Sequence, residues 1–132
     1  MTDILPAPDC RLFRAEQVRQ LDQIAIAEQT ITGIDLMQRA GQAVWDLLVE
    51  NWQEARRIVI VCGAGNNAGD GYIVATLAAA HGRQVIVLAL QSPDLLKGDA
   101  FIAARRYLDA GGTVQTFSTD ALDSAEVIVD AI

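Results

Sequence analysis

An apolar run that ends abruptly in a turn rich in glycine and asparagine is the feature that most constrains how this chain folds. Ile58–Cys62 is typical of a buried strand, Gly63–Gly71 of a tight turn, and Tyr72–Ala80 of an alanine-rich helix. A turn of this kind directs several backbone N–H groups toward one point and can bind an anion. Its two asparagines and its aspartate also offer oxygen atoms to a cation. The segment therefore predicts a strand–turn–helix unit with a binding site at the turn.

The rest of the chain alternates between apolar segments with the spacing of strands and segments with the spacing of helices. Alternation at this length predicts parallel strands joined by right-handed crossovers. We therefore expect the α/β fold class, with a Rossmann-like, doubly wound, mostly parallel sheet and helices on both faces, a three-layer α/β/α sandwich. The expected strands are Ile58–Cys62, Gln84–Leu90, Thr113–Phe117 and Ala125–Ile132, and the expected helices are Ala15–Glu28, one that ends at Asn51, Asp70–Ala80 and Lys97–Ala110.

Local signals mark the ends and faces of these helices. Asp35 is the expected N-cap of the second helix, and Gln38, three residues later, would complete a capping box. Gly41 lies inside the same helix, where glycine costs about 1 kcal/mol relative to alanine, so we expect it to allow a close approach to another backbone. In the last helix, the side chains expected to face the core are Ala100, Ala103, Ala104 and Leu108.

Two familiar phosphate-binding loops fit the turn poorly. A Walker A loop ends in Lys followed by Ser or Thr, whereas Gly69 is followed by Asp70, which excludes that loop. The dinucleotide fingerprint G-x-G-x-x-G/A matches the segment from Gly63 to Ala68. It also requires an acidic residue at the end of the second strand, but Gln84–Leu90 is followed by a neutral Gln-Ser pair. A nicotinamide-dependent oxidoreductase site is therefore disfavoured, and a purely structural turn remains open.

Three segments of the chain resemble the NAD(P)H-hydrate epimerases, the YjeF N-terminal domain family. Gly63–Gly71, with the Tyr-Ile-Val-Ala that follows, resembles the family's signature loop. Leu36–Gly41 resembles the helix motif ahead of the first strand, and Val127–Ile132 resembles the strand that ends in a functional aspartate. The three matches occur in the family's order and span most of the chain.

The resemblance implies an isomerase of nicotinamide nucleotide repair that interconverts the R and S epimers of hydrated NADH and NADPH. It implies K⁺ as a cofactor, with Asn67 and Asp130 as ligands, and Asp130 as the candidate acid–base residue. It also implies a homodimer, and the family includes bifunctional proteins in which a dehydratase domain follows. The implied substrate-binding residues are Asn66, Asn67, Ala68, Gly69 and Asp70.

The chain departs from the family pattern in two ways. Ala68 stands where the family usually has glycine. If this position needs a left-handed backbone, alanine costs roughly 1–2 kcal/mol, and we then expect a shifted loop with the site retained. The family's domain also continues beyond the Val-Asp-Ala strand, so we expect residues 1–132 to be the first part of such a domain.

Composition narrows the classes of partner. The formal net charge is −7 and the basic residues are scattered, which argues against a nucleic-acid-binding surface. Cys62 closes an apolar strand and is expected in the core. No apolar stretch is long enough for a membrane span and no basic-apolar leader is visible, so we expect a cytoplasmic protein. The alternative function is a non-catalytic Rossmann-like dimerisation or scaffold domain, which would have no need of the Asn-Asn segment.

Overall fold

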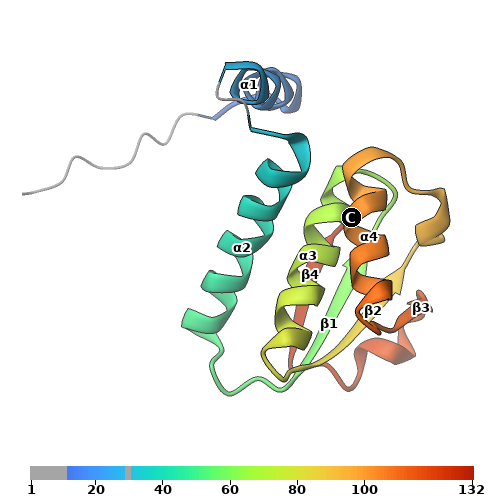
Figure 1. The fold of residues 1–132 in the computed structure, drawn as a ribbon. Helices are drawn as coiled ribbons and strands as arrows, with labels where there is room; N and C mark the ends of the chain where they lie inside the picture. The colour runs from blue at the N-terminus through green and yellow to red at the C-terminus, as the bar shows by residue number, and fades with distance from the viewer. Residues whose placement is uncertain (1–11, 29–30) are drawn as a thin grey trace, which may run out of the picture. The chain divides into compact units, whose positions relative to one another are not determined.

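The computed structural model describes residues 12–28 and 31–132, which belong to two units that divide between Ile31 and Thr32. The first unit contains helix α1 (Ala15–Glu28), with the bounds predicted from the sequence (Figure 1). On the apolar face of this helix, Val18, Leu21 and Ile24 are 44–50% exposed.

The second unit is built on a four-stranded parallel sheet, which confirms the expected Rossmann-like α/β fold. Its strand order is β3-β2-β1-β4, so the chain moves outward from β1 to β3 and then returns to the other side of β1. This reversal makes the sheet doubly wound. The strands are β1 (Arg57–Cys62), β2 (Gln84–Ala89), β3 (Val114–Thr116) and β4 (Val127–Ala131).

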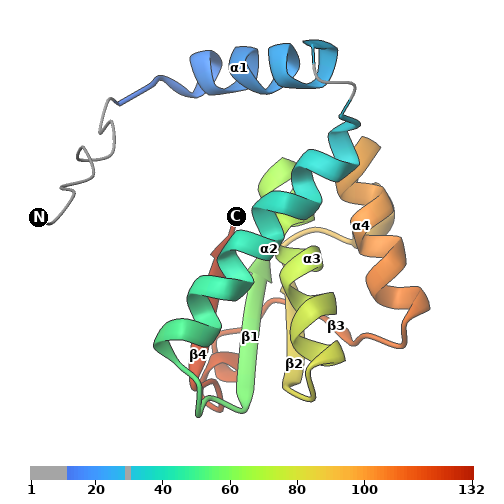
Figure 2. The same ribbon diagram turned by 60° about the vertical axis from the view of Figure 1, so that its left-hand side comes forward.

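Helices α2 (Gly33–Asn51), α3 (Asn66–Ala80) and α4 (Gly98–Asp109) cover one face of the sheet (Figure 2). Alternate residues of β1, beginning with Ile58, join buried side chains of all three helices in one core. The connection from β3 to β4 runs in the opposite direction across the sheet, and right-handed crossover rules assign it to the other face. That connection contains the short 3-10 helix η2 (Asp120–Leu122), whereas η1 (Pro93–Leu95) precedes α4.

Helix α2 starts earlier than predicted, and Asp35 is not its N-cap. The N-cap is Thr32, whose Oγ1 accepts a hydrogen bond from the Asp35 backbone N–H at 3.2 Å. The same hydroxyl donates to Asp35 Oδ2 at 2.6 Å. Asp35, three residues after the N-cap Thr32, therefore takes the second position of the capping box. The prediction gave that position to Gln38.

Helix α3 also starts earlier than predicted, at Asn66 instead of Asp70. Gly65 is the N-cap and has extended backbone angles, φ −116° and ψ −159°. The two asparagines therefore form the first turn of the helix and not a loop before it. Ala68 lies inside this helix, where no left-handed backbone is needed, so the expected shift of the loop was wrong.

Helix α4 matches its prediction to within one residue at each end. Ala100, Ala103 and Ala104 are buried as expected, but Tyr107 is buried in place of Leu108, which is only half-buried. The Tyr107 hydroxyl donates to the Thr113 carbonyl and accepts from the Thr113 N–H, both at 2.9 Å. These bonds satisfy its polar end and allow the ring to enter the core.

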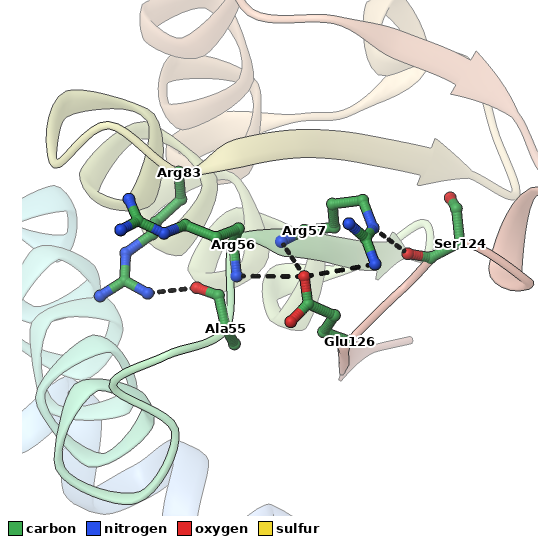
Figure 3. Close-up of polar contacts among 6 residues, drawn as sticks. All are labelled: Ala55, Arg56, Arg57, Arg83, Ser124 and Glu126. Atoms are coloured by element: carbon green, nitrogen blue, oxygen red, sulfur yellow. Dashed lines mark hydrogen bonds and ion pairs between the residues drawn. The ribbon is translucent and has the colours of Figure 1, made fainter.

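A cluster of polar contacts at the amino ends of β1 and β4 holds these two strands together (Figure 3). Glu126 Oε1 accepts hydrogen bonds from the backbone N–H groups of Arg56 and Arg57, at 3.4 and 3.3 Å. The Arg57 guanidinium lies 3.4 Å from the same carboxylate oxygen and donates to the Ser124 carbonyl at 2.7 Å. In the resulting register, Val61 is opposite Asp130 and Cys62 is opposite Ala131.

Candidate functional site

The carboxyl ends of β1 and β4 define the switch point of the sheet. The chain leaving β1 passes through α3 toward β2, whereas β4 lies on the other side of β1. Ligands of open α/β sheets bind where adjacent strands diverge in this way. The Asn66–Asp70 segment follows β1, and Asp130 is the last residue but one of β4. Every residue that the sequence proposed for the site therefore belongs to segments at this edge of the sheet.

Two glycines allow the backbones to approach closely at the switch point. The Gly63 N–H donates to the Ala131 carbonyl at 3.0 Å, and a Cβ on Gly63 would lie 3.0 Å from the Ile132 Cα. A Cβ on Gly71 would lie 2.6 Å from the Ala131 Cβ and 2.8 Å from Cys62 Sγ. These glycines bring the turn after β1 and the first turns of α3 against the end of β4.

Asn67 and Asp130 both hydrogen-bond to the backbone of Ile132. Asn67 Nδ2 donates to the Ile132 carbonyl at 3.0 Å, and the Ile132 N–H donates to Asp130 Oδ1 at 3.1 Å. Strand alternation starts the Asp130 side chain on the face opposite Ala131, but its bond to Ile132 keeps the carboxylate at the strand end. Both side chains are exposed. An amide, a carboxylate and a carbonyl group therefore gather around one residue of the backbone.

The other residues proposed for substrate binding have different surroundings. Asn66 is exposed beside Asn67, and Asp70 is half-buried in the second turn of α3. Ala68 and Gly69 are buried, and a Cβ on Gly69 would meet the side chain of Met37 and the Cα of Ala100. Gly69 therefore allows α3 to pack between α2 and α4. It could contact a ligand only through its backbone atoms.

The start of α3 is suited to binding an anionic or polar ligand. Its N-cap, Gly65, has no side chain with which to cap the helix. The backbone N–H groups of the first turn carry the positive end of the helix dipole, and anions bind at such ends. Only residues 63–65 separate the end of β1 from the first turn of α3, so this end of α3 belongs to the switch point.

The oxygen atoms at this edge are of the chemical type that could hold a hard monovalent cation such as K⁺. Within residues 12–28 and 31–132, no group of three or more His, Cys, Asp or Glu side chains is placed to hold a metal ion. The groups near Ile132 are instead one amide, one carboxylate and one backbone carbonyl. Oxygen ligands of these kinds suit hard cations.

Cys62 is a core residue, as predicted. It is fully buried at the end of β1, with Sγ 3.7 Å from the Ala68 carbonyl oxygen. Burial raises the pKa of its thiol to about 12, so the group stays protonated at neutral pH. A protonated, inaccessible thiol is a poor nucleophile.

The surface of this unit carries at least two open grooves. One, of about 360 Å³, lies between α2 and the free edge of β4, is mostly apolar and shares no residue with the switch point. The other, of about 320 Å³, lies at the carboxyl ends of β2 and β3. Sequence reasoning missed this second groove, although the position of its residues at strand ends was a usable signal. Its lining residues are Ala89, Leu90, Ser92, Pro93, Val114, Gln115 and Thr116.

The part of the chain that the structure describes contains no helix with the length and apolar character of a membrane span.

Comparison with known proteins identifies relatives over most of the chain. The family model described as YjeF-related protein N-terminus matches residues 33–132. The bifunctional NAD(P)H-hydrate repair enzymes Nnr of Coxiella burnetii and Escherichia coli are 38% and 36% identical to the chain over 92% of its length. The NAD(P)H-hydrate epimerase of Rhodopirellula baltica is 30% identical over 100% of the chain.

These relatives are longer than the chain. It covers 25% and 24% of the two bifunctional enzymes and 56% of the Rhodopirellula epimerase. A crystal structure of the yeast protein ynu0 (YNL200c) has a TM-score of 0.74 at 17% identity, over 92% of this chain and 56% of the yeast chain. That likeness supports the fold assignment independently of the sequence matches.

Proposed function

Because this chain belongs to the family of YjeF-related protein N-termini, we propose that it carries an NAD(P)H-hydrate epimerase activity, interconverting the R and S forms of hydrated NADH and NADPH. The observation that carries the proposal is the meeting of Asn67 and Asp130 at Ile132. This pair lies at the switch point of a doubly wound sheet, where such folds bind nucleotides.

The proposed roles follow from chemistry and exposure. Inversion at the hydrated ring carbon requires a bond to that carbon to break and re-form, with a proton transferred each way. Asp130 presents an exposed carboxylate to take and return that proton. The Asn66–Asp70 segment would position the substrate through the amides of Asn66 and Asn67 and through backbone N–H groups of the helix start.

We propose K⁺ as the bound cation, held by Asn67 and Asp130. When bound, the ion would supply a fixed positive charge beside the substrate. This proposal is supported by two hydrogen bonds to the same residue: Asn67 Nδ2 donates to the Ile132 carbonyl, and the Ile132 N–H donates to Asp130 Oδ1. A homodimer, a location in the cytoplasm and a continuation of the domain beyond these residues also remain proposals, drawn from the family resemblance.

The test uses the full-length protein and hydrated NADPH. Exchange between the R and S epimers is followed by chromatography and compared with the slow spontaneous rate. We expect acceleration by the wild type and a loss of about tenfold to hundredfold in kcat/KM for Asn67→Ala, because the substrate and cation lose a positioning group.

The matched control is Asn51→Ala. Asn51 is also exposed, and its Nδ2 donates to a backbone carbonyl, that of Leu47, at 2.8 Å, but it lies at the far end of α2. This variant should retain wild-type activity. A wild-type protein that does not exceed the spontaneous rate, or an Asn67→Ala variant as active as Asn51→Ala, would remove the proposal.

A further inference from the structure

The groove at the ends of β2 and β3 lies on the same edge of the sheet as the candidate site. All four strands are parallel, so their carboxyl ends share one edge. In the order β3-β2-β1-β4, the centre of the groove is two strand spacings from the crevice between β1 and β4. Neighbouring strands are about 4.8 Å apart, which makes this separation on the order of 10 Å. A dinucleotide is long enough to occupy both places.

The start of α3 lies between these two places, because β1 is flanked by β4 on one side and β2 on the other. In doubly wound folds, the helix start after the first strand binds the pyrophosphate, and the end of the second strand binds the ribose of the adenosine half. We propose that the groove at β2 and β3 binds the adenosine half of the dinucleotide hydrate, so that the hydrated nicotinamide ring lies at Asp130. This inference rests on the proposed function.

The groove has the chemistry of a nucleoside site. Leu90, Pro93 and Val114 offer apolar surface to a purine ring, and Leu90 is 49% exposed. Gln115 and Thr116 are exposed and present an amide and a hydroxyl for hydrogen bonds to a sugar. Such a mixture of apolar walls and a few polar groups is typical of small-molecule sites.

The groove is also electrically neutral. A dinucleotide enzyme carries its ribose-binding acid at the end of the second strand. Among the polar lining residues, Ser92 is nearest in sequence to the end of β2, and its Oγ accepts from the Asp94 N–H at 3.4 Å. Asp94 itself does not line the groove. A neutral lining neither repels a 2′-phosphate nor selects for it, so the adenosine halves of NADH hydrate and NADPH hydrate both fit. Adding one carboxylate should break this equality.

The first test is Gln115→Glu, which adds one negative charge without changing the size of the side chain. In the full-length protein, the ratio of KM for NADPH hydrate to KM for NADH hydrate should rise about threefold to tenfold, with kcat unchanged. The matched control is Gln84→Glu, because Gln84 is also exposed but lies at the amino end of β2, and this change should leave the ratio unchanged. Ser92→Asp is the second groove variant and also adds one carboxylate. Ser92 is the N-cap of η1, and aspartate is as good an N-cap residue as serine, so the local structure should be retained.

Calorimetry with adenosine 2′,5′-bisphosphate and 5′-AMP tests the groove without the nicotinamide half. Gln115→Glu and Ser92→Asp should weaken the bisphosphate threefold to tenfold more than 5′-AMP. An unchanged preference in both variants, or a wild type that binds neither nucleotide at millimolar concentration, would overturn the adenosine site. Binding of these probes does not depend on turnover. The calorimetry can therefore contradict the adenosine site while the activity assay supports the epimerase proposal, and the reverse.

Discussion

Gly65 and Gly71 belong to the same sequence motif, but a side chain added at these two positions would affect packing very differently. A Cβ on Gly71 would collide with Ala131 and with Cys62 Sγ, neither of which is the end of a flexible side chain. A Cβ on Gly65 would meet nothing within 4 Å. Gly71 is therefore required for α3 to lie against the sheet, whereas Gly65 is free to change as far as packing is concerned.

We expect Gly71→Ala to lower the free energy of unfolding by about 2 kcal/mol, because overpacking a close contact outweighs the better helix propensity of alanine. Gly65→Ser should be nearly neutral, since serine is a good N-cap residue. Chemical denaturation of the two variants measures the difference. Equal stabilities would show that α3 can move away from β4 at little cost.

At the scale of elements, the middles of helices and strands were predictable but the helix starts were not. Both α2 and α3 begin before the predicted residue. A helix start depends on which polar side chain reaches a free N–H group, and in α2 Thr32 and Asp35 compete for that role. In α3, the Gly-Asn segment looks like a loop, but the chain enters the helix immediately after the turn from β1.

Thr32→Ala should destabilise the second unit by about 1 kcal/mol, because the hydroxyl that accepts from the Asp35 N–H is lost. Thr32→Ser retains the hydroxyl and should be close to wild type. Thermal unfolding of both variants, followed by circular dichroism, provides the measurement. A Thr32→Ser variant as unstable as Thr32→Ala would assign the loss to the threonine methyl group and not to the cap.

For the whole molecule, the stability of the fold should fall in alkaline solution. Burial raises the pKa values of Cys62, Tyr72 and Tyr107, and that of Cys62 reaches about 12. The unfolded chain releases the same thiol proton near pH 9.0 and the tyrosine protons near pH 10.0. Above pH 9 the unfolded chain therefore binds fewer protons than the native protein, and the free energy of unfolding decreases as pH rises.

Urea titrations at a series of pH values test this expectation. The contribution of Cys62 should be complete below pH 9 and diminish as pH rises toward 12. Cys62→Ala should be less stable at pH 7, because it leaves a small cavity, but should lose less stability between pH 9 and 10. The tyrosines should keep the decline above pH 10 in both proteins. If the free energy of unfolding fell equally steeply between pH 9 and 10 in the wild type and in Cys62→Ala, the Cys62 thiol would not be the cause of this part of the decline.

The sequence by itself determined the alternation of strands and helices, and with it the parallel sheet, because apolar spacing and segment length are local properties. Resemblance added the identities of Asn67 and Asp130 as candidates. Only the tertiary structure decided that both meet the backbone of Ile132, which is 65 residues from Asn67 in the chain. It also decided that Ala68 and Gly69 serve packing and that Gln115 joins a groove on the same edge. These outcomes depend on strand order and register, which arise from contacts between segments distant in sequence and leave no local pattern.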